Sequence, residues 1–260
     1  MSTDKISIIT ACYNAESTIR ETLESVLCQT YAQIEHVIVD GASKDRTVSI
    51  IKSFEEKYRQ RNVKLVFISE KDRGIQDAYN KAIRMASGDW LIFINSGDML
   101  YDSNVLMNVI HFKPEKTVDV LYGDIELFFH KRNERRILTY PDVIDIAFLK
   151  RQTICHQALF FKRHLFLDYG EYDCTFRIAS DFDRILVFFL AGAVYHHVPV
   201  VISVFVDDGV STINFKKSIL ERIAILENRL KKVGFATYAR HYIFLVLISL
   251  KRLLTGSFRK

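Results

Sequence analysis

Glycine, proline and cysteine are scarce in this sequence, with 10 Gly, 3 Pro and 4 Cys among 260 residues. Together with 49% hydrophobic and 26% charged residues, this composition excludes collagen-like, low-complexity and disordered chains. No Cys-x-x-Cys pair is present, which argues against a zinc ribbon and a secreted disulfide framework; the cysteines are Cys12, Cys28, Cys155 and Cys174. We expect one large domain, or one domain with an appendage, in a reducing compartment.

Long apolar runs are missing as well. The longest run without a charge, Tyr242–Leu250, has nine residues, about half of the roughly 20 that a membrane-spanning helix needs. Residues 1–5 lead directly into a strand-like segment, with no apolar signal segment before it. These absences predict a cytoplasmic protein that does not cross a membrane.

Positive charge is unevenly distributed along the chain. The net charge of +5 would by itself suit a nucleic-acid-binding protein. Residues 214–260, however, contain 11 Lys or Arg and 2 Asp or Glu, whereas residues 1–213 contain 25 and 29. The basic excess therefore belongs to a tail over residues 214–260, and the domain expected over residues 1–213 is mildly acidic. We expect no nucleic-acid partner for that domain.

Short β-branched and aromatic runs alternate with helical patterns in the first hundred residues. Strands are predicted at Ile6–Ala11, His36–Val39, Val63–Ile68 and Trp90–Ile94. Thr18 and Glu21 have the spacing of a capping box at the start of the first helix. Strands that alternate with helices in this way predict an α/β fold with a doubly wound, mainly parallel sheet.

The second half is less regular. Strands are predicted at Leu121–Phe129 and Val198–Val206, and a buried helix at Phe182–Leu190. The basic stretch Lys131–Arg136 is predicted to be a loop or a hairpin tip. From Phe215 onward, apolar residues recur every three or four positions with charges between them, which predicts an amphipathic helical tail.

Polar residues follow each of the four predicted strands of the first half. In a parallel sheet, ligands gather at the carboxyl ends of the strands, so these residues are the candidates for a site. The turn after the first strand has no Gly-x-Gly-x-x-Gly, and no Gly-x-x-x-x-Gly-Lys loop occurs. The sequence therefore disfavours NAD-type and P-loop nucleotide sites.

Four motifs occur in order in the first hundred residues. They are Ile8-Ile9-Thr10-Ala11-Cys12-Tyr13-Asn14, Asp40-Gly41-x-Ser43-x-Asp45-x-Thr47, Asp72-x-Gly74-Ile75-x-Asp77-Ala78-x-Asn80-Lys81 and Ser87-Gly88-Asp89. Together they resemble family 2 glycosyltransferases with the GT-A fold, of the type that builds bacterial surface polysaccharides. The resemblance covers about residues 5–210. It implies a GT-A domain with a Rossmann-like nucleotide-sugar half at residues 1–100 and an acceptor half at residues 101–213.

The resemblance also implies which residues bind the nucleotide. These are Thr10, Ala11, Tyr13, Asn14, Asp40, Asp72, Gly74 and Asp77. Tyr13 would stack on the base, and Asp40 would accept a hydrogen bond from the edge of the base. The alternative for Asp40 is that it caps the turn that follows its strand.

A divalent cation, Mg²⁺ or Mn²⁺, is implied at the end of the fourth strand, where the family has an Asp-x-Asp element that holds the diphosphate of the donor. Here the sequence is Asn95-Ser96-Gly97-Asp98, so Asp98 supplies the only carboxylate and the Asn95 amide oxygen is a weaker partner. The alternative is that Asp98 caps the next turn.

The catalytic base is implied by the run Ser180-Asp181-Phe182-Asp183-Arg184, which resembles the Glu-Asp-x-Asp element of the family. By this resemblance, Asp181 deprotonates the acceptor hydroxyl, and direct displacement with one base inverts the anomeric carbon. Asp183 has three alternatives: it caps the helix, pairs with Arg184, or is itself the base in the acceptor pocket. Ser180 stands where the family usually has Glu.

Three further segments of the second half contain candidate residues. His156 lies in a stretch that resembles the acceptor-side strand and loop, so it either contacts the acceptor or a phosphate or is a packed core histidine. His196 and His197 have no second ligand pair at metal spacing and are expected to be structural. The Asp207–Ser211 loop resembles the late Gly-Val-Ser element of the family.

The tail combines basic residues with a large apolar face. The run Phe244–Ile248 lies between Arg240 and Lys251, and phosphate-tracking arms rarely contain so many large apolar residues. We expect this segment to bind an anionic membrane surface; a partner or dimer helix is the alternative, so a homo-oligomer stays open.

The sequence therefore predicts an inverting glycosyltransferase that takes a sugar from a nucleotide diphosphate sugar, with UDP-sugars favoured. The acceptor would be a hydroxyl of a glycan or a lipid-linked molecule in surface polysaccharide synthesis, at the inner face of the cell membrane. One alternative is a sugar nucleotidyltransferase, although these normally begin with a Gly-rich, Arg-containing loop that is missing here. A second is a degenerate, non-catalytic binder of nucleotide or partner, suggested by Asn95 and Ser180 in place of acidic residues.

Overall fold

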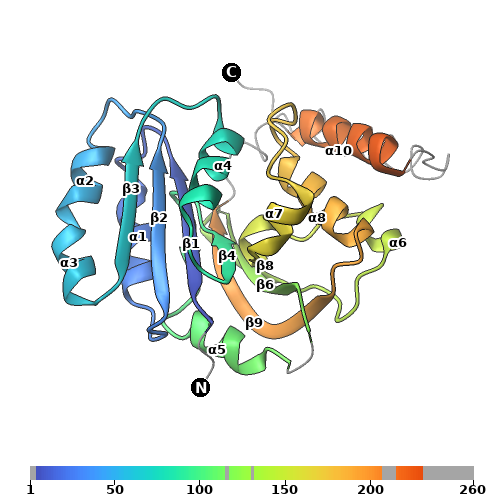
Figure 1. Ribbon diagram of the computed structural model, residues 1–260, viewed down its shortest axis with the longest axis horizontal. Helices are drawn as coiled ribbons and strands as arrows, with labels where there is room; N and C mark the ends of the chain where they lie inside the picture. The colour runs from blue at the N-terminus through green and yellow to red at the C-terminus, as the bar shows by residue number, and fades with distance from the viewer. Residues whose placement is uncertain (1–3, 115–116, 130–131, 207–214, 231–260) are drawn as a thin grey trace.

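The computed structural model describes residues 4–114, 117–129, 132–206 and 215–230 (Figure 1). The strands are β1 (Ile6–Cys12), β2 (Ile34–Asp40), β3 (Lys64–Ser69), β4 (Trp90–Phe93), β5 (Met99–Leu100), β6 (Val120–Phe129), β7 (Glu134–Leu138), β8 (Leu159–Lys162) and β9 (Tyr195–Val206). The helices are α1 (Ile19–Leu27), α2 (Thr47–Ser53), α3 (Glu55–Gln60), α4 (Ile75–Met85), α5 (Val105–Phe112), α6 (Ile146–Leu149), α7 (His164–Tyr169), α8 (Ser180–Leu190) and α10 (Phe215–Leu230), with a short 3₁₀ turn at His156–Ala158.

The first four long strands form the parallel half of the sheet, in the order β3-β2-β1-β4. Cys12 at the end of β1 pairs with Asp40 at the end of β2, and Asp40 pairs with Ser69 at the end of β3. The carboxyl ends of these strands are therefore level, which brings the loops that follow them to one edge. The predicted α/β fold with a doubly wound, mainly parallel sheet is confirmed in this half.

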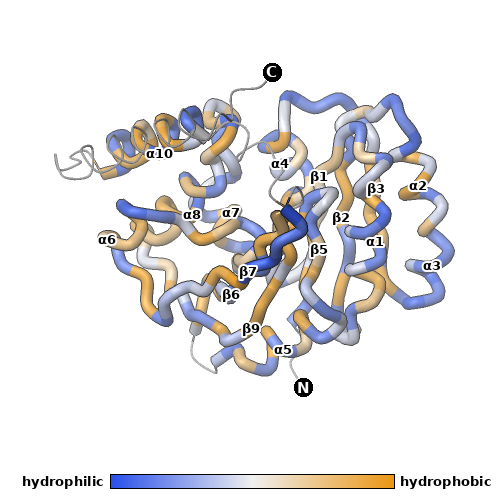
Figure 2. The backbone as a smooth tube through the Cα atoms, turned by 180° about the vertical axis from the view of Figure 1, so that it is seen from behind, coloured by the Kyte–Doolittle hydropathy of each residue, from blue (hydrophilic) through white to orange (hydrophobic). Residues whose placement is uncertain are grey.

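The second half of the sheet is mixed. β8 pairs antiparallel with both β4 and β6, β9 runs parallel to β6, and the short β5 and β7 pair with β9 and β6. β9 is long and curved, so the sheet curls under the helices of this half (Figure 1). All five residues of β7 are exposed, and it is one of the most hydrophilic strands in Figure 2.

Helices cover both faces of the sheet, because the strand side chains alternate between two apolar clusters. Ile9 and Ala11 of β1 belong to the cluster shared with α4, α7, α8 and α10, whereas Ile6 and Ile8 belong to the cluster shared with α1, α2, α3 and α5. Each cluster consists of residues with little or no exposure to solvent. This two-sided burial makes the strand ends the natural place for polar chemistry.

The predicted tail begins with α10, which packs on α8 (Figure 1). Ile219, Ile225 and Leu226 of α10 are buried, and the last two belong to the apolar cluster that contains α8. The apolar segment at residues 238–254 and the Asp207–Ser211 loop lie outside the described residues. Within the described part of the chain, the helices are too short or too polar to cross a bilayer.

Several local predictions were wrong. Thr18 makes no side-chain cap, because its hydroxyl donates back to the Ala15 carbonyl at 3.5 Å, so the capping box does not form. The helical segment between β2 and β3 is divided into α2 and α3 at Phe54, which is buried. β5, β7 and β8 were not predicted, and β7 takes in part of the Lys131–Arg136 stretch that was expected to be a loop or a hairpin tip.

Candidate functional site

Three loops converge at the carboxyl edge of the parallel strands. A Cβ atom added to Gly41, after β2, would lie 2.6 Å from Asp72 Oδ2 and 3.3 Å from Tyr13 Cδ2, so a larger residue here would displace the Asp72 carboxylate. Tyr13 follows β1 and Asp72 follows β3, as the sequence predicted. Tyr13 is 61% exposed, which leaves its ring accessible for stacking. The structure therefore brings Tyr13 and Asp72 together across the end of β2.

Asp40 has a different environment from the one predicted. It is fully buried, and its carboxylate accepts hydrogen bonds from the backbone N–H and hydroxyl of Ser43 and from the Ser69 hydroxyl at 2.6 Å. Asp40 thus caps the turn after its strand, which is the alternative stated for it in the sequence analysis. A nucleobase would have to displace one of these hydroxyl donors to reach Asp40, so a direct contact with the base stays a prediction.

The side chains of Thr10 and Ala11 are packed inside the protein. The Thr10 hydroxyl donates to the Ile94 carbonyl at 2.6 Å and lies 2.8 Å from His36 Nε2, and its side chain is fully buried. Ala11 is 7% exposed and belongs to an apolar cluster. Because β1 directs both side chains into packed surroundings, only their backbone is available to a nucleotide, and their place in the nucleotide site stays a prediction.

Asn14 joins the loops after β1 and β2. Its backbone has φ of 47°, its N–H donates to the Ser43 hydroxyl at 2.7 Å, and its Oδ1 accepts from the Lys44 N–H at 2.9 Å. Asn is among the few residues that adopt this left-handed conformation readily. Asn14 therefore shapes the loop edge of the site.

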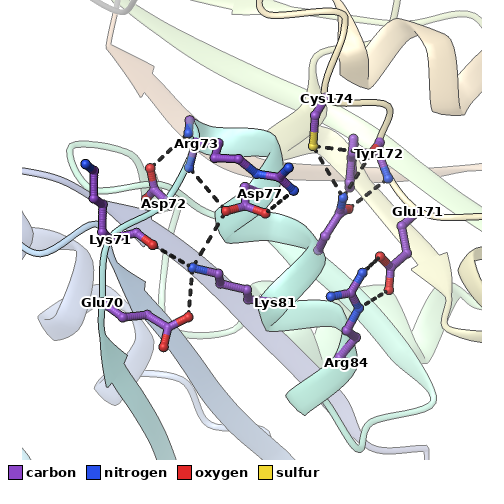
Figure 3. A network of polar contacts seen from close by, with 12 residues as sticks. Glu70, Lys71, Asp72, Arg73, Asp77, Lys81, Arg84, Glu171, Tyr172 and Cys174 are labelled. Atoms are coloured by element: carbon purple, nitrogen blue, oxygen red, sulfur yellow. Dashed lines mark hydrogen bonds and ion pairs between the residues drawn. The ribbon is translucent and has the colours of Figure 1, made fainter.

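The loop after β3 is held by a polar network (Figure 3). The Gly74 N–H donates to Asp72 Oδ1 at 2.9 Å, and Gly74 has φ of 123°, a region that favours glycine. Asp77, in the first turn of α4, accepts from the Arg73 N–H at 3.1 Å and lies 3.7 Å from Lys81 Nζ. The carboxylate of Asp77 is thus engaged in holding this loop, while Gly74 and Asp72 shape its tip.

The segment after β4 carries the predicted metal ligands. Asp98 is 7% exposed, and its Oδ2 accepts from Gln157 Nε2 at 2.6 Å. Asn95 Oδ1 accepts from the Tyr79 hydroxyl at 2.9 Å. Among the described residues, no group of three or more His, Cys, Asp or Glu is arranged to hold a metal. Within this segment Asp98 offers a carboxylate and Asn95 an amide oxygen.

Asp181 occupies the first turn of α8, where the sequence predicted the base. Burial raises the pKa of its carboxyl from 3.8 to about 6; the Phe182 N–H, which donates to it at 2.8 Å, and the Arg222 guanidinium oppose this rise, and the Glu221 carboxylate adds to it. A carboxyl group with a pKa near 6 is mostly ionised at neutral pH and still accepts a proton readily.

Asp181 and Asp98 act on the same polar region. Burial is the main reason why the pKa of Tyr79 is raised, and the charges of Asp181 and Asp98 add to the rise. The pKa of Cys155 is raised by burial, Asp98 and Asp181 in that order. Both carboxylates therefore influence Tyr79, whose hydroxyl donates to Asn95 after β4.

Asp183 is engaged in a buried ion pair network. It is fully buried, and its two oxygens accept from Arg184 Nη2 at 2.5 Å and from Arg229 Nε at 2.8 Å. Arg184 also donates to the Gly170 carbonyl at 2.9 Å. The structure thus selects the pairing alternative, and the predicted contact of Asp183 with the acceptor is corrected.

His156 is a core residue. It is 6% exposed, its ring stacks on Phe93 with centroids 4.5 Å apart, and its Nε2 lies 2.7 Å from the Tyr172 hydroxyl. Burial lowers the pKa of His156 to about 3, which keeps it neutral. The predicted contact with the acceptor or a phosphate is corrected, since a neutral ring packed among aromatic residues offers no charge to a phosphate.

Several residues around the base were missed by sequence reasoning. Gln76 at the start of α4 donates to the Arg177 carbonyl at 2.9 Å and to the Ser180 hydroxyl at 3.1 Å. The others are Tyr79, Gln157, Glu221 and Arg222. Gln157 adjoins His156 and could have been suspected from that stretch. Glu221 and Arg222 had no comparable signal, because charges between the apolar positions of a helix usually face solvent.

Comparisons with known proteins agree with this architecture. The model of the family described as glycosyl transferase family 2 matches residues 7–171. A PGL/p-HBAD biosynthesis glycosyltransferase of Mycobacterium bovis is 32% identical over 185 residues, which cover 70% of this chain and 69% of that protein. An uncharacterized glycosyltransferase of Mycobacterium tuberculosis is 31% identical over 184 residues, covering 70% of this chain and 67% of that protein.

Solved structures share the fold. The mannosyltransferase PcManGT from Pyrobaculum calidifontis, in complex with GDP-Man and Mn²⁺, aligns with a TM-score of 0.68 at 19% identity, over 89% of this chain and 65% of that one. TarS of S. aureus aligns with a TM-score of 0.66 at 21% identity, over 92% of this chain; the chain spans 43% of TarS. The family model, the curated relatives and the GT-A fold agree, and the chain belongs to glycosyl transferase family 2 as a glycosyltransferase.

Proposed function

We propose that this glycosyltransferase moves a sugar from a nucleotide diphosphate sugar to an acceptor hydroxyl, with inversion and with Asp181 as the base. The observation that carries the proposal is the position of Asp181: a partly exposed carboxylate at the start of α8, with a pKa of about 6, beside the region that Asp98 also influences. A base of this strength suits neutral pH.

The chemistry is a direct displacement. Asp181 accepts the proton of the acceptor hydroxyl while that oxygen forms a bond to the anomeric carbon. The bond between the anomeric carbon and the diphosphate oxygen breaks, and nucleoside diphosphate leaves with the bonding electrons. One displacement inverts the anomeric configuration. Asp183 does not compete for this role, because two arginines occupy its oxygens inside the protein.

A divalent cation fits the donor groups after β4. Asp98 and the Asn95 and Gln157 amides offer oxygen atoms, which Mg²⁺ and Mn²⁺ prefer, and a single carboxylate suits a cation that takes its other ligands from diphosphate and water. When bound, the cation would neutralise the departing diphosphate. The presence of Mn²⁺ with GDP-Man in the mannosyltransferase PcManGT supports this assignment.

We favour a UDP-sugar as donor. Tyr13 is exposed beside Gly41 and Asp72, which suits stacking on a nucleobase. TarS, which shares the fold, has been solved in complex with UDP-GlcNAc. The GDP-Man complex of PcManGT makes GDP-sugars the alternative in the same assay. The acceptor that we propose is a glycan or a lipid-linked molecule, in keeping with the PGL/p-HBAD biosynthesis relative.

The location that we propose is the cytoplasmic face of the cell membrane. The basic and apolar residues of the segment after α10 support peripheral binding to anionic lipids. Co-sedimentation with vesicles that contain phosphatidylglycerol, compared with neutral phosphatidylcholine vesicles, tests this proposal. Analytical ultracentrifugation decides whether the protein forms a homo-oligomer.

A thermal-shift screen identifies the donor. UDP, GDP, UDP-GlcNAc and GDP-Man are each tested with and without Mn²⁺ or Mg²⁺, because a ligand that binds the folded state raises its apparent stability. Asp98→Asn is expected to lose the increment that depends on the cation and to keep the rest.

Turnover of the selected donor then tests the base. Asp181→Asn is expected to lose about 100-fold or more of nucleoside diphosphate release while it still binds the donor. Asp168→Asn, on the exposed surface of α7, is the matched control. Full activity of Asp181→Asn would show that the base assignment is wrong. Release of pyrophosphate would indicate a nucleotidyltransferase, and donor binding without turnover a degenerate binder.

A further inference from the structure

The segment that carries Asp181 is held by a helix beyond the region matched by the family model, which ends at residue 171. Residues 177–179 precede α8, and Ala179, its N-cap, provides no side-chain cap. The backbone N–H groups at a helix start need acceptors from elsewhere. Here the acceptor comes from α10.

Glu221 of α10 supplies it. Its carboxylate accepts from the N–H groups of Arg177 at 3.2 Å, Ile178 at 2.8 Å and Ala179 at 2.9 Å. A negative charge at the start of a helix is also favoured by the helix dipole. Because Asp181 lies two residues beyond Ala179, the position of its backbone depends directly on these three hydrogen bonds.

The next residue, Arg222, lies over the residue that follows the base. Its guanidinium carbon is 4.7 Å from the centroid of the Phe182 ring. The Nε and Nη2 atoms of Arg222 are buried, and neither has a hydrogen-bond partner among the described residues. Burying a cation without full hydrogen bonding is costly, so a compensating negative charge nearby is expected, and Asp181 provides it.

The opposite side of the same segment is held by the donor half. Gln76 of α4 donates to the Arg177 carbonyl and to the Ser180 hydroxyl, at 2.9 and 3.1 Å. Residues 177–180 are therefore fixed between α4, which begins at the Gly74 loop, and α10. A shift of either helix would move Asp181.

We infer that α10 belongs to the catalytic machinery, with Glu221 as a positioning residue for the Asp181 base and Arg222 as the cation that stabilises its ionised form. The inference rests on the proposed function, since it assumes that Asp181 is the base. It assigns a role to the first helix of the predicted tail that is independent of any membrane binding by the residues after it.

The charged and titratable groups around Asp181 make the inference testable by titration. Tyr79, Tyr140, Tyr172 and Cys155 sense the charge of Asp181 but are neutral at working pH, since burial raises the pKa of each. The charged groups that act on Asp181 are Glu221, which raises its pKa, and Arg222, which lowers it. Two adjacent residues of α10 thus have opposite effects.

The experiment uses the full chain with ¹³C-labelled aspartate, and Asp181→Asn identifies the carboxyl resonance of Asp181. Glu221→Gln is expected to lower the pKa of Asp181 by about half a pH unit or more, and Arg222→Met to raise it by a similar amount. Glu227→Gln, an exposed position on the same helix, is the control and should leave the titration unchanged. Circular dichroism melting verifies that each variant is folded.

Donor turnover separates this inference from the proposed function. If Asp181 is the base, Glu221→Gln lowers kcat about tenfold or more with the KM for the donor within twofold of wild type. Shifts of the two titrations in the same direction, or no shift in either, would overturn the inference. Loss of the base assignment would appear separately as full turnover by Asp181→Asn, whatever the titrations show.

Discussion

Replacing Asp181 with Asn is expected to stabilise the protein at neutral and alkaline pH while it removes the proposed base. Burial raises the pKa of this carboxyl from 3.8 to about 6. In the unfolded chain the group ionises near the lower value, so the unfolded state releases the proton first. The folded state therefore loses stability as the pH rises from about 4 to about 6, and the loss persists above that range.

The size of this effect follows from the difference between the two pKa values. About two pH units correspond to about 3 kcal/mol of unfolding free energy at pH 8. Asp181 is partly exposed, and solvent screening reduces the figure to about 1–2 kcal/mol. At pH 5 the folded state holds most of its proton, so only about half of the penalty applies. Asp181→Asn should therefore gain more stability at pH 8 than at pH 5.

Urea unfolding at pH 8 and at pH 5 measures the unfolding free energy that Asp181→Asn gains at each pH. Asp168→Asn serves as the control, because its carboxylate is on the surface and its loss should change the unfolding free energy by less than about 0.5 kcal/mol. An Asp181→Asn protein that gains no stability at pH 8, or gains equally at both pH values, would refute the reasoning. The pKa that suits Asp181 to act as a base would then have no support.

Three further predictions concern the surroundings of the site. Asp183→Asn leaves the buried Arg184 guanidinium without its carboxylate and removes the partner of Arg229, so it should lower the unfolding free energy by about 3–5 kcal/mol in urea; a smaller loss would argue against a rigid network. Tyr13→Ala should weaken nucleoside diphosphate binding by about 1–3 kcal/mol in calorimetry with an unchanged Tm, and unchanged binding would exclude stacking. A chain of residues 1–230 should melt at the same temperature as the full chain. A chain of residues 1–213 should melt at a far lower temperature, because Ile219, Ile225 and Leu226 are lost from the core. Equal melting temperatures of the two truncated chains would contradict an integral role of α10.

The parallel half of the fold was predictable because its signals are local. Each strand is a short β-branched run, and the turn residues after it mark where it ends, so the sequence alone places Tyr13 and Asp72 at one edge of the sheet, where both approach Gly41. The mixed half was harder to predict, since β8 is only four residues long and is defined by its partners β4 and β6. Pairing of that kind is a tertiary property that hydrophobic periodicity does not reveal.

In the site, too, local motifs predict where a residue lies, whereas tertiary contacts decide what its side chain binds. A motif places Asp40 and His156 near a site, but it does not say which hydrogen bonds their side chains make. Ser43 and Ser69 engage Asp40, and Tyr172 engages His156, through contacts between segments distant in sequence. Asp181 lies in the first turn of α8, which begins two residues before the predicted helix, and its role as the base stays a prediction. Its raised pKa was not predictable, because it depends on burial by elements from across the chain.

The distribution of charge takes on a different meaning once α10 is placed. The acidic domain and the basic tail looked like two separate surfaces, with 29 acidic residues in one and 11 basic residues in the other. Two of those basic residues, Arg222 and Arg229, instead act on carboxylates of α8: Arg222 on Asp181 and Arg229 on Asp183. Part of the positive charge therefore compensates acidic groups that the catalytic half has buried. The basic residues left for the proposed anionic surface are therefore the exposed Lys216 and Lys217 of α10 and those that follow residue 230.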